Sequence, residues 1–154
     1  MKPIISKALS LVVISATLLS FSPKRGGAPG KPMAAKGGEG FEIILNNKIM
    51  FQQFGKEMST VQSLQLNQLS VNDQLNLKYY HCGKAGNNRV ITIRDSQNNL
   101  LKEFRYGNAS SASAAMALPV KEILGLKKGK TVALKLYYAS DELPNGRMLI
   151  SLVI

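Results

Sequence analysis

The sequence predicts an all-β fold, an antiparallel β-sandwich of about eight or nine strands with one short helical turn. From Phe41 onward, short runs rich in β-branched, aromatic and aliphatic residues are separated by Asn, Gly, Asp and Ser. In most runs apolar side chains alternate with polar ones, as in a strand with one buried face. The pattern contains no helical period of useful length and no strand–helix–strand unit, so two sheets packed face to face are favoured.

The first two expected strands, 41–45 and 49–54, are joined by Asn46-Asn47-Lys48. Asparagine tolerates positive φ, so this connection predicts a tight hairpin. A third strand is expected over 60–66 and a fourth over 74–81. Both alternate apolar and polar residues, which predicts that each turns one face to water.

A second hairpin is expected from strands 89–95 and 100–106, because the loop between them is dense in Asp, Ser and Asn. A four-residue loop over 96–99 sets the register and places an apolar row on one face. The expected pairs are Asp95 with Leu100, Arg94 with Leu101, Ile93 with Lys102, Thr92 with Glu103, and Ile91 with Phe104.

The last third of the chain predicts a short strand at 116–118 and a helical turn over 120–124, bounded by a proline and a glycine. A strand follows over 131–139. A turn is expected over 141–146 and a terminal strand over 147–154. The terminal strand is expected to keep four apolar side chains in phase, namely Met148, Ile150, Leu152 and Ile154.

Three segments are expected along the chain. Residues 1–22 are typical of a secretory signal peptide, since Lys2 and Lys7 precede an uncharged, mostly apolar run of 14 residues. Residues 23–40 combine Gly, Pro and basic residues with few large apolar side chains, which predicts a disordered spacer. Residues 41–154 form the expected sandwich domain.

The apolar run is shorter than the roughly 20 residues of a membrane-spanning helix, so cleavage is favoured over a stable membrane span. An uncleaved anchor is the alternative. Two cleavage sites stay open, one at 20–22 and one near 33–35. We expect export to the periplasm, the cell surface or the medium.

The chain is basic, with 20 Lys and Arg against 9 Asp and Glu and a net charge of +11. Five of the positive charges lie in residues 1–33, which leaves about +6 on the remainder. Apart from a cluster at 127–130, the cations are scattered, whereas nucleic-acid modules cluster them among aromatic residues. A nucleic-acid partner is therefore disfavoured, and an anionic or carbohydrate partner outside the cytoplasm is expected.

The chain has one histidine and one cysteine, so few side chains suited to acid–base, metal or thiol chemistry are present. His81 and Cys82 are adjacent, but neighbouring strand residues point to opposite faces and a structural zinc site needs about four ligands. We predict no catalytic residue, no metal site and no cofactor. Two alternatives stay open: a copper or zinc carrier that uses His81, Cys82 and methionines, and a hydrolase whose carboxylates meet only in the fold.

Tyrosine and arginine are favoured at recognition surfaces, and tyrosine rings stack on sugars. On this basis the expected function is a non-catalytic binding or structural module for carbohydrate, cell-envelope or protein partners. The alternative interpretation of the same residues is half-exposed strand packing. The candidate interaction surface consists of Tyr80, His81, Arg89, Arg105, Tyr106 and Tyr137.

The expected signal peptide at 1–22 (the leader), the Gly-rich spacer at 23–40 and three further stretches resemble short exported β-sandwich proteins of Bacteroidota that lack a characterised function. The three stretches are 41–48, 79–83 and 143–149. The resemblance implies export and a β-sandwich. It implies no activity and no site.

Overall fold

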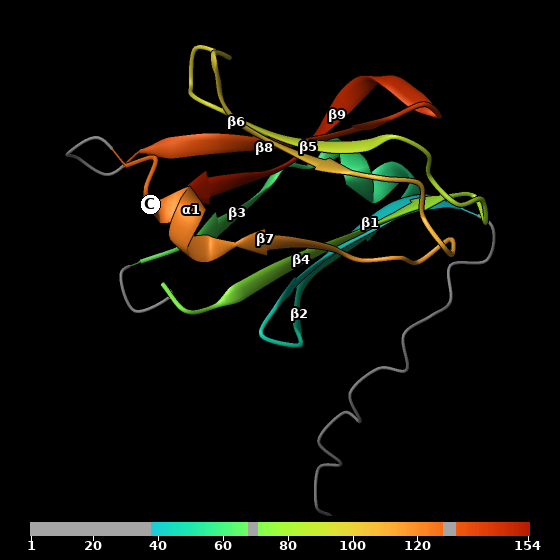
Figure 1. The fold of residues 1–154 in the computed structure, drawn as a ribbon, viewed down its shortest axis with the longest axis horizontal. Helices are drawn as coiled ribbons and strands as arrows, with labels where there is room; N and C mark the ends of the chain where they lie inside the picture. Colours follow the sequence, from blue (N-terminus) through green and yellow to red (C-terminus); the bar gives the residue numbers. More distant parts are fainter. Residues whose placement is uncertain (1–37, 68–70, 128–131) are drawn as a thin grey trace, which may run out of the picture. The chain divides into compact units, whose positions relative to one another are not determined.

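Two β-sheets form the part of the chain that the computed structural model describes, residues 38–67, 71–127 and 132–154 (Figure 1). These residues belong to one unit that spans Met33–Ile154. Nine strands are present in the described ranges, which confirms the expected all-β class. The expected leader at 1–22 and most of the spacer at 23–40 lie outside the described residues.

The first sheet has the strand order β2-β1-β4-β7, and all its neighbours are antiparallel. It consists of β1 (Glu39–Leu45), β2 (Lys48–Phe54), β4 (Gln74–His81) and β7 (Met116–Pro119). The expected hairpin between β1 and β2 is confirmed. Its two loop asparagines have the positive φ values, 48° and 65°, that a type I′ turn requires.

The second sheet has the order β3-β9-β8-β5-β6. It consists of β3 (Gln62–Gln65), β5 (Arg89–Arg94), β6 (Leu100–Tyr106), β8 (Ala133–Ser140) and β9 (Leu143–Val153). The pair β3 and β9 is parallel, so this sheet is mixed, whereas the sequence predicted antiparallel strands throughout. Parallel pairing joins segments far apart in the chain, and strand periodicity carries no information on it.

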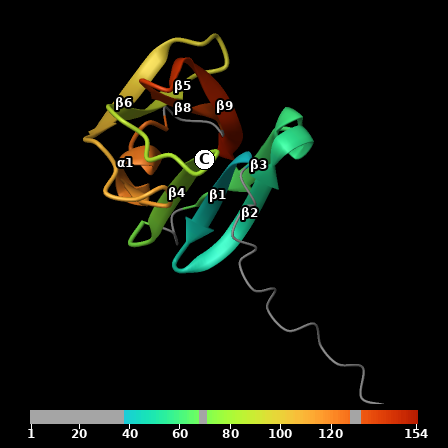
Figure 2. The same cartoon turned by 90° about the vertical axis from the view of Figure 1, so that its right-hand side faces the viewer.

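Two short helices connect strands. The 3-10 helix η1 (Gly55–Ser59) links β2 to β3 and buries Met58, and no helix was expected there from the sequence. The helix α1 (Val120–Leu124) follows β7 where the helical turn was expected. Figure 2 shows β2 and β3 together at one flank of the domain and α1 at the other. Among the described residues, no helix has the length and hydropathy needed to cross a membrane.

The facing sides of the two sheets form the core. Leu75, Leu77 and Tyr79 of β4 point inward, as their alternation predicted. The largest fully buried side chains come from both sheets and from α1, and are Phe41, Ile43, Leu66, Leu75, Leu77, Ile91, Ile93, Met116, Leu118, Ile123, Leu134 and Tyr138.

The register of the β5–β6 hairpin agrees with the prediction over most of its length. Three of the expected pairs, at Ile91, Thr92 and Ile93, are present. Arg94, however, pairs with Leu100 rather than Leu101, because a register shift follows Ile93. Asp95 does not pair with Leu100 and instead closes the loop, where its carboxylate accepts hydrogen bonds from the backbone amides of residues 97 and 99.

The end of the chain departs further from the prediction. The strand β9 begins at Leu143, so the turn is limited to 141–142 and the Pro-Asn-Gly stretch lies within the strand. Tyr137 pairs with Met148 and Leu136 with Ile150, which makes Leu149 an extra residue on β9. Such a bulge reverses the side-chain phase, and Met148 is therefore half-buried while Leu149 is buried. Thr131, the expected start of the preceding strand, lies outside the described residues.

Candidate functional site

Polar side chains line two hollows in the described part of the chain. The first, the end hollow, lies at one end of the sandwich and has a volume of about 270 Å³. It is lined by Glu39, His81, Cys82, Lys84 and Glu142. The second, the flank groove, has a volume of about 400 Å³. It is lined by Met50, Phe51, Gln52, Gln53, Glu57, Thr60 and Gln62.

His81 is the central side chain of the end hollow. It is the last residue of β4, and its side chain points between the sheets, so the residue is only 8% exposed. Its Nε2 atom lies 2.9 Å from the hydroxyl oxygen of Tyr138 and 3.3 Å from that of Ser140. Both partners belong to β8, so these contacts connect the first sheet to the second.

A second set of contacts connects the sheets beside His81. The rings of Tyr79 and Tyr138 stack with centroids 4.3 Å apart. The Tyr79 hydroxyl donates a hydrogen bond to Glu39, and Glu39 also lies 3.3 Å from the Arg147 guanidinium. The end of the core therefore consists of stacked rings and a paired carboxylate, not of aliphatic side chains.

The electrostatics of the end hollow favour a neutral imidazole beside an ionised carboxylate. Burial lowers the pKa of His81 below its ordinary 6.5, and the carboxylates of Glu142 and Glu39 offset part of this effect. For Glu142, burial alone would raise the pKa. Hydrogen bonds from Asn87, Ser140 and its own backbone have the larger, opposite effect, and the resulting pKa is about 2. The two groups lie 4.0 Å apart, and at neutral pH their contact is not an ion pair because His81 is uncharged.

Ser140, His81 and Glu142 are the residue types of a catalytic triad, but their geometry differs from one. In a triad the nucleophile and the acid contact opposite imidazole nitrogens. Here the Ser140 hydroxyl and the Glu142 carboxylate both face Nε2, which the Tyr138 hydroxyl also contacts. Ser140 is only 6% exposed. The three groups therefore do not form a nucleophile–base–acid relay.

The described residues contain no group of three or more His, Cys, Asp or Glu side chains placed to hold a metal ion. His81 points into the sandwich, while the next residue, Cys82, is exposed and has a φ of 52°. The left-handed backbone at Cys82 ends β4, and both residues line the end hollow.

The six residues of the predicted interaction surface lie in three places. Tyr80 is on the outer face of the first sheet, where its ring packs against Phe54. Arg105 and Tyr137 are on the outer face of the second sheet, and each contacts a charged neighbour there: Arg105 pairs with Glu103, and the Arg94 guanidinium lies over the Tyr137 ring.

The other three residues face inward. His81 lies in the end hollow. Arg89 is buried and donates hydrogen bonds to the carbonyl oxygens of Gly107 and Ala114. Tyr106 pairs with Arg89 across the β5–β6 hairpin, and its hydroxyl donates to the Ala117 carbonyl.

Two residues of the predicted interaction surface, His81 and Arg89, both pack against Gly86. A Cβ atom at this position would lie 2.9 Å from the Tyr138 hydroxyl and 3.2 Å from both Arg89 and His81. The glycine thus permits close packing around the imidazole. Four further residues of this region were not predicted from the sequence, because their proximity to His81 arises only from the pairing of distant strands. They are Tyr138, Ser140, Glu39 and Glu142.

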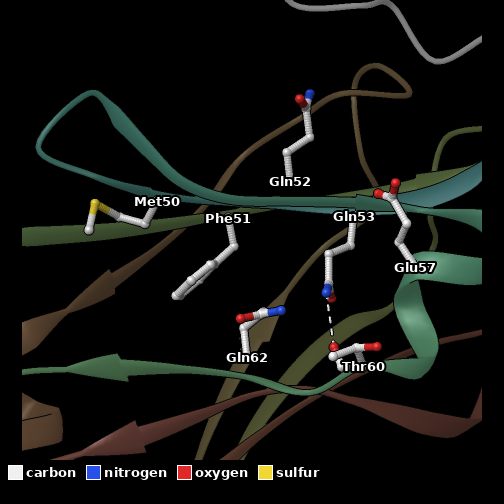
Figure 3. Close-up of a pocket in the computed structure, with 7 residues that line it drawn as sticks. All are labelled: Met50, Phe51, Gln52, Gln53, Glu57, Thr60 and Gln62. Carbon is white, nitrogen blue, oxygen red and sulfur yellow. Dashed lines mark hydrogen bonds between the residues drawn. The ribbon is translucent and has the colours of Figure 1, made fainter.

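The flank groove runs between β2, the edge of the first sheet, and β3, the edge of the second. Figure 3 shows Phe51 and Gln53 pointing from β2 toward β3, and Gln52 pointing the other way. The Gln53 amide donates to the Thr60 carbonyl over 2.9 Å. Gln53 is 6% exposed, and its Oε1 atom has no hydrogen-bond partner among the described residues.

One position in the sequence signals this groove, although it was not among the predicted site residues. Gln53 occupies an inward position of β2, opposite Phe41, where the alternating pattern calls for an apolar residue. A polar side chain at a core position often marks a site, since burying an unpaired polar atom costs free energy.

The fold and these hollows define a two-sheet all-β domain with an amide-lined groove along one flank. The sequence matches no known family model and no curated protein. The resemblance to exported Bacteroidota proteins stays a prediction.

Proposed function

We propose that the protein is an exported, non-catalytic binding module and that the flank groove is its ligand site. The observation that carries the proposal is the chemistry of the groove lining. It combines the amides of Gln53 and Gln62, one threonine and an aromatic ring along the open edge of the sandwich, whereas the Gln52 side chain points away and donates to Glu42. Small numbers of placed polar groups beside an aromatic side chain are typical of recognition sites.

The lining favours an uncharged, hydrogen-bonding ligand. Each glutamine amide offers two donors and an acceptor. Although the chain has a net charge of +11, no lysine or arginine is among the described residues that line the groove, and Glu57 is the sole charged one. A carbohydrate, another cell-envelope polymer or a protein partner fits this chemistry better than an anion does.

The end hollow supports the non-catalytic part of the proposal. The Glu39 carboxylate is engaged by Tyr79 and Arg147, and the Glu142 carboxylate by Asn87. The His81 nitrogen that faces Glu142 is occupied by two hydroxyl groups. Groups held in this way stabilise the end of the sandwich and are poorly placed to exchange protons with a substrate.

Retention on immobilised ligands tests the proposal. The full-length protein is passed over neutral polysaccharides, peptidoglycan and envelope proteins, and compared with Gln62→Ala. Gln62 lines the groove, whereas Gln65 of the same strand is exposed, so Gln65→Ala is the matched control. We expect retention by at least one matrix, a reduction of about tenfold or more in Gln62→Ala, and no change in Gln65→Ala. Equal retention of all three proteins, or no retention on any matrix, refutes the groove as a ligand site.

Export is tested separately by fractionating cells that express the full-length chain and sequencing the N-terminus of the recovered protein. We expect the protein outside the cytoplasm, with a new N-terminus near 20–22 or 33–35. Recovery from the cytoplasm with residue 1 intact contradicts export.

A further inference from the structure

The four outer strands of the two sheets differ in how they are protected against pairing with another chain. An edge strand presents unpaired backbone N–H and C=O groups, and proteins block such edges with charges, prolines, short strands or covering elements. In the described residues, β7 has four residues, ends at Pro119 and runs into α1. The edge strand β6 carries Lys102, Glu103 and Arg105, and β3 has only four residues.

The edge strand β2 is less protected: its one charge is Lys48 at its first residue, and a bulge makes Met50 an extra residue opposite β1. It is seven residues long, and from Ile49 to Phe54 it contains no charge and no proline. Ile49 and Met50 are 44% and 36% exposed, and Val61, just before β3, is 48% exposed. Three of the four large apolar side chains that are exposed in the described residues thus lie at this flank.

The flank groove follows the backbone of β2. Four consecutive residues, Met50 to Gln53, line it. Met50 is the extra residue of a bulge, but Phe51, Gln52 and Gln53 alternate between the two faces, so these three can line one groove only if it runs along the edge of the strand. The free backbone groups of β2 are therefore accessible from the groove, next to the buried Gln53 amide oxygen that lacks a partner among the described residues.

We infer that β2 binds an extended peptide segment of a partner protein as an added strand of the first sheet. This inference rests on the proposed function and names its ligand. In such strand addition, main-chain hydrogen bonds supply affinity and pockets for alternate side chains supply specificity. Alternate side chains of the peptide enter the groove near Phe51 and Gln62, so its central residues are uncharged. An acidic residue fits opposite Lys48, the exposed cation at the start of β2.

A peptide fits this edge better than a second copy of the chain. A strand of seven residues is about 24 Å long, and pairing along it covers on the order of 250 Å² per partner. A stable interface between two folded proteins covers about 800 Å² on each.

The experiment measures binding of labelled seven-residue peptides to the full-length protein by fluorescence anisotropy. The peptides alternate valine, isoleucine, leucine or phenylalanine with threonine and end in aspartate. Two matched series carry N-methyl groups, one on the odd-numbered and one on the even-numbered backbone nitrogens of the peptide. Each series removes the N–H donors on one edge of the peptide without changing its side chains. The protein variants are Met50→Lys on the β2 edge and, as the control, Leu100→Lys on the β6 edge, where Leu100 is 54% exposed.

We expect the best peptides to bind the wild-type protein and Leu100→Lys equally, and to bind Met50→Lys at least tenfold more weakly. Of the two N-methylated series, the one that lacks the N–H groups facing β2 is expected to lose binding, and the other series is expected to keep it. Circular dichroism of each variant checks folding, while the N-methyl comparison uses the unaltered protein and is independent of it.

Several results overturn the inference. One is that no peptide binds; another is that both N-methylated series bind like the parent peptides. A concentration-dependent dimer that Met50→Lys abolishes identifies a second copy as the occupant instead. If peptides fail while polysaccharide retention still depends on Gln62, the peptide inference falls and the proposed binding function stands. If neither ligand depends on the groove, both fall.

Discussion

The Nε2 atom of His81 lies 2.9 Å from the hydroxyl oxygen of Tyr138, and this contact joins the last residue of β4 to a strand of the opposite sheet. Most of the remaining contact between the two sheets is made by apolar side chains, and the Glu39–Arg147 pair and the Tyr106–Ala117 hydrogen bond are further polar contacts between them. A hydrogen bond is directional, so this contact favours one relative placement of β4 and β8. Both groups are buried, and loss of either partner leaves the other without part of its hydrogen bonding.

Replacing Tyr138 with phenylalanine tests how much this contact contributes to the free energy of unfolding. Tyr138→Phe keeps the ring stacked on Tyr79 but removes the hydroxyl from His81. We expect a loss of about 1–2 kcal/mol in the free energy of unfolding, measured by urea denaturation. Tyr137→Phe is the control, since Tyr137 lies on the outer face, and a change within about 0.5 kcal/mol is expected there. Equal losses in the two variants contradict a special role for the His81 contact.

The stability of the protein is expected to fall as the pH drops below about 6.5. Burial lowers the pKa of His81 in the folded protein, whereas the unfolded chain binds a proton at the ordinary value of 6.5. Below that pH the unfolded state holds more protons, so acidification favours unfolding until the folded imidazole also titrates. His81 is the one histidine of the chain, which assigns this part of the pH dependence to a single residue.

Chemical denaturation at several pH values between 7 and 5 measures this effect in the wild-type protein and in His81→Gln. The variant is expected to be less stable at pH 7 and to show a smaller decline on acidification. Parallel curves for the two proteins contradict the assignment to His81. Glu142, with its pKa of about 2, contributes at lower pH: its stabilisation is present above 4.5 and is lost as the pH falls through 2.

Local sequence signals predicted the strands and hairpins well, because turn residues and two-residue alternation act within a few positions. The asparagines between β1 and β2 and most of the β5–β6 register belong to this group. The parallel β3–β9 pair and the bulge at Leu149 depend on partners distant in the chain and were missed. For the same reason His81 could be selected from the sequence, but Tyr138, 57 residues away, could not be recognised as its partner.

Gly86 is expected to tolerate no side chain. A Cβ atom there would crowd the Tyr138 hydroxyl at 2.9 Å, and the buried side chains around it have little room to move. We expect Gly86→Ala to destabilise the protein by about 1–3 kcal/mol, as other overpacked sites do. Gly107→Ala is the matched control, since a Cβ atom at Gly107 meets nothing within 4 Å. Thermal unfolding of the two variants provides the comparison, and a midpoint for Gly86→Ala equal to that of Gly107→Ala shows that the site can relax.

Arg89 fastens the loop between β6 and β7. Its Nε donates to the Gly107 carbonyl over 3.1 Å, and a terminal nitrogen donates to the Ala114 carbonyl over 2.9 Å. Arg89→Met keeps an apolar stem of similar length but leaves both carbonyls without these donors. Because hydrogen bonds to a charged group contribute about 1.5–3 kcal/mol, we expect the loop to open locally more often.

Limited proteolysis measures that opening. The loop from 107 to 115 is rich in alanine and serine, so elastase, which cleaves after small residues, reports on its exposure. Cleavage in this loop is expected to be about tenfold faster or more in Arg89→Met than in the wild-type protein. Arg105→Met is the control because the Arg105 side chain is 77% exposed and its contact with Glu103 is a surface ion pair. If both variants are cut at the wild-type rate, then Arg89 does not hold the loop, and the backbone contact between Ala109 and Gly86 is sufficient.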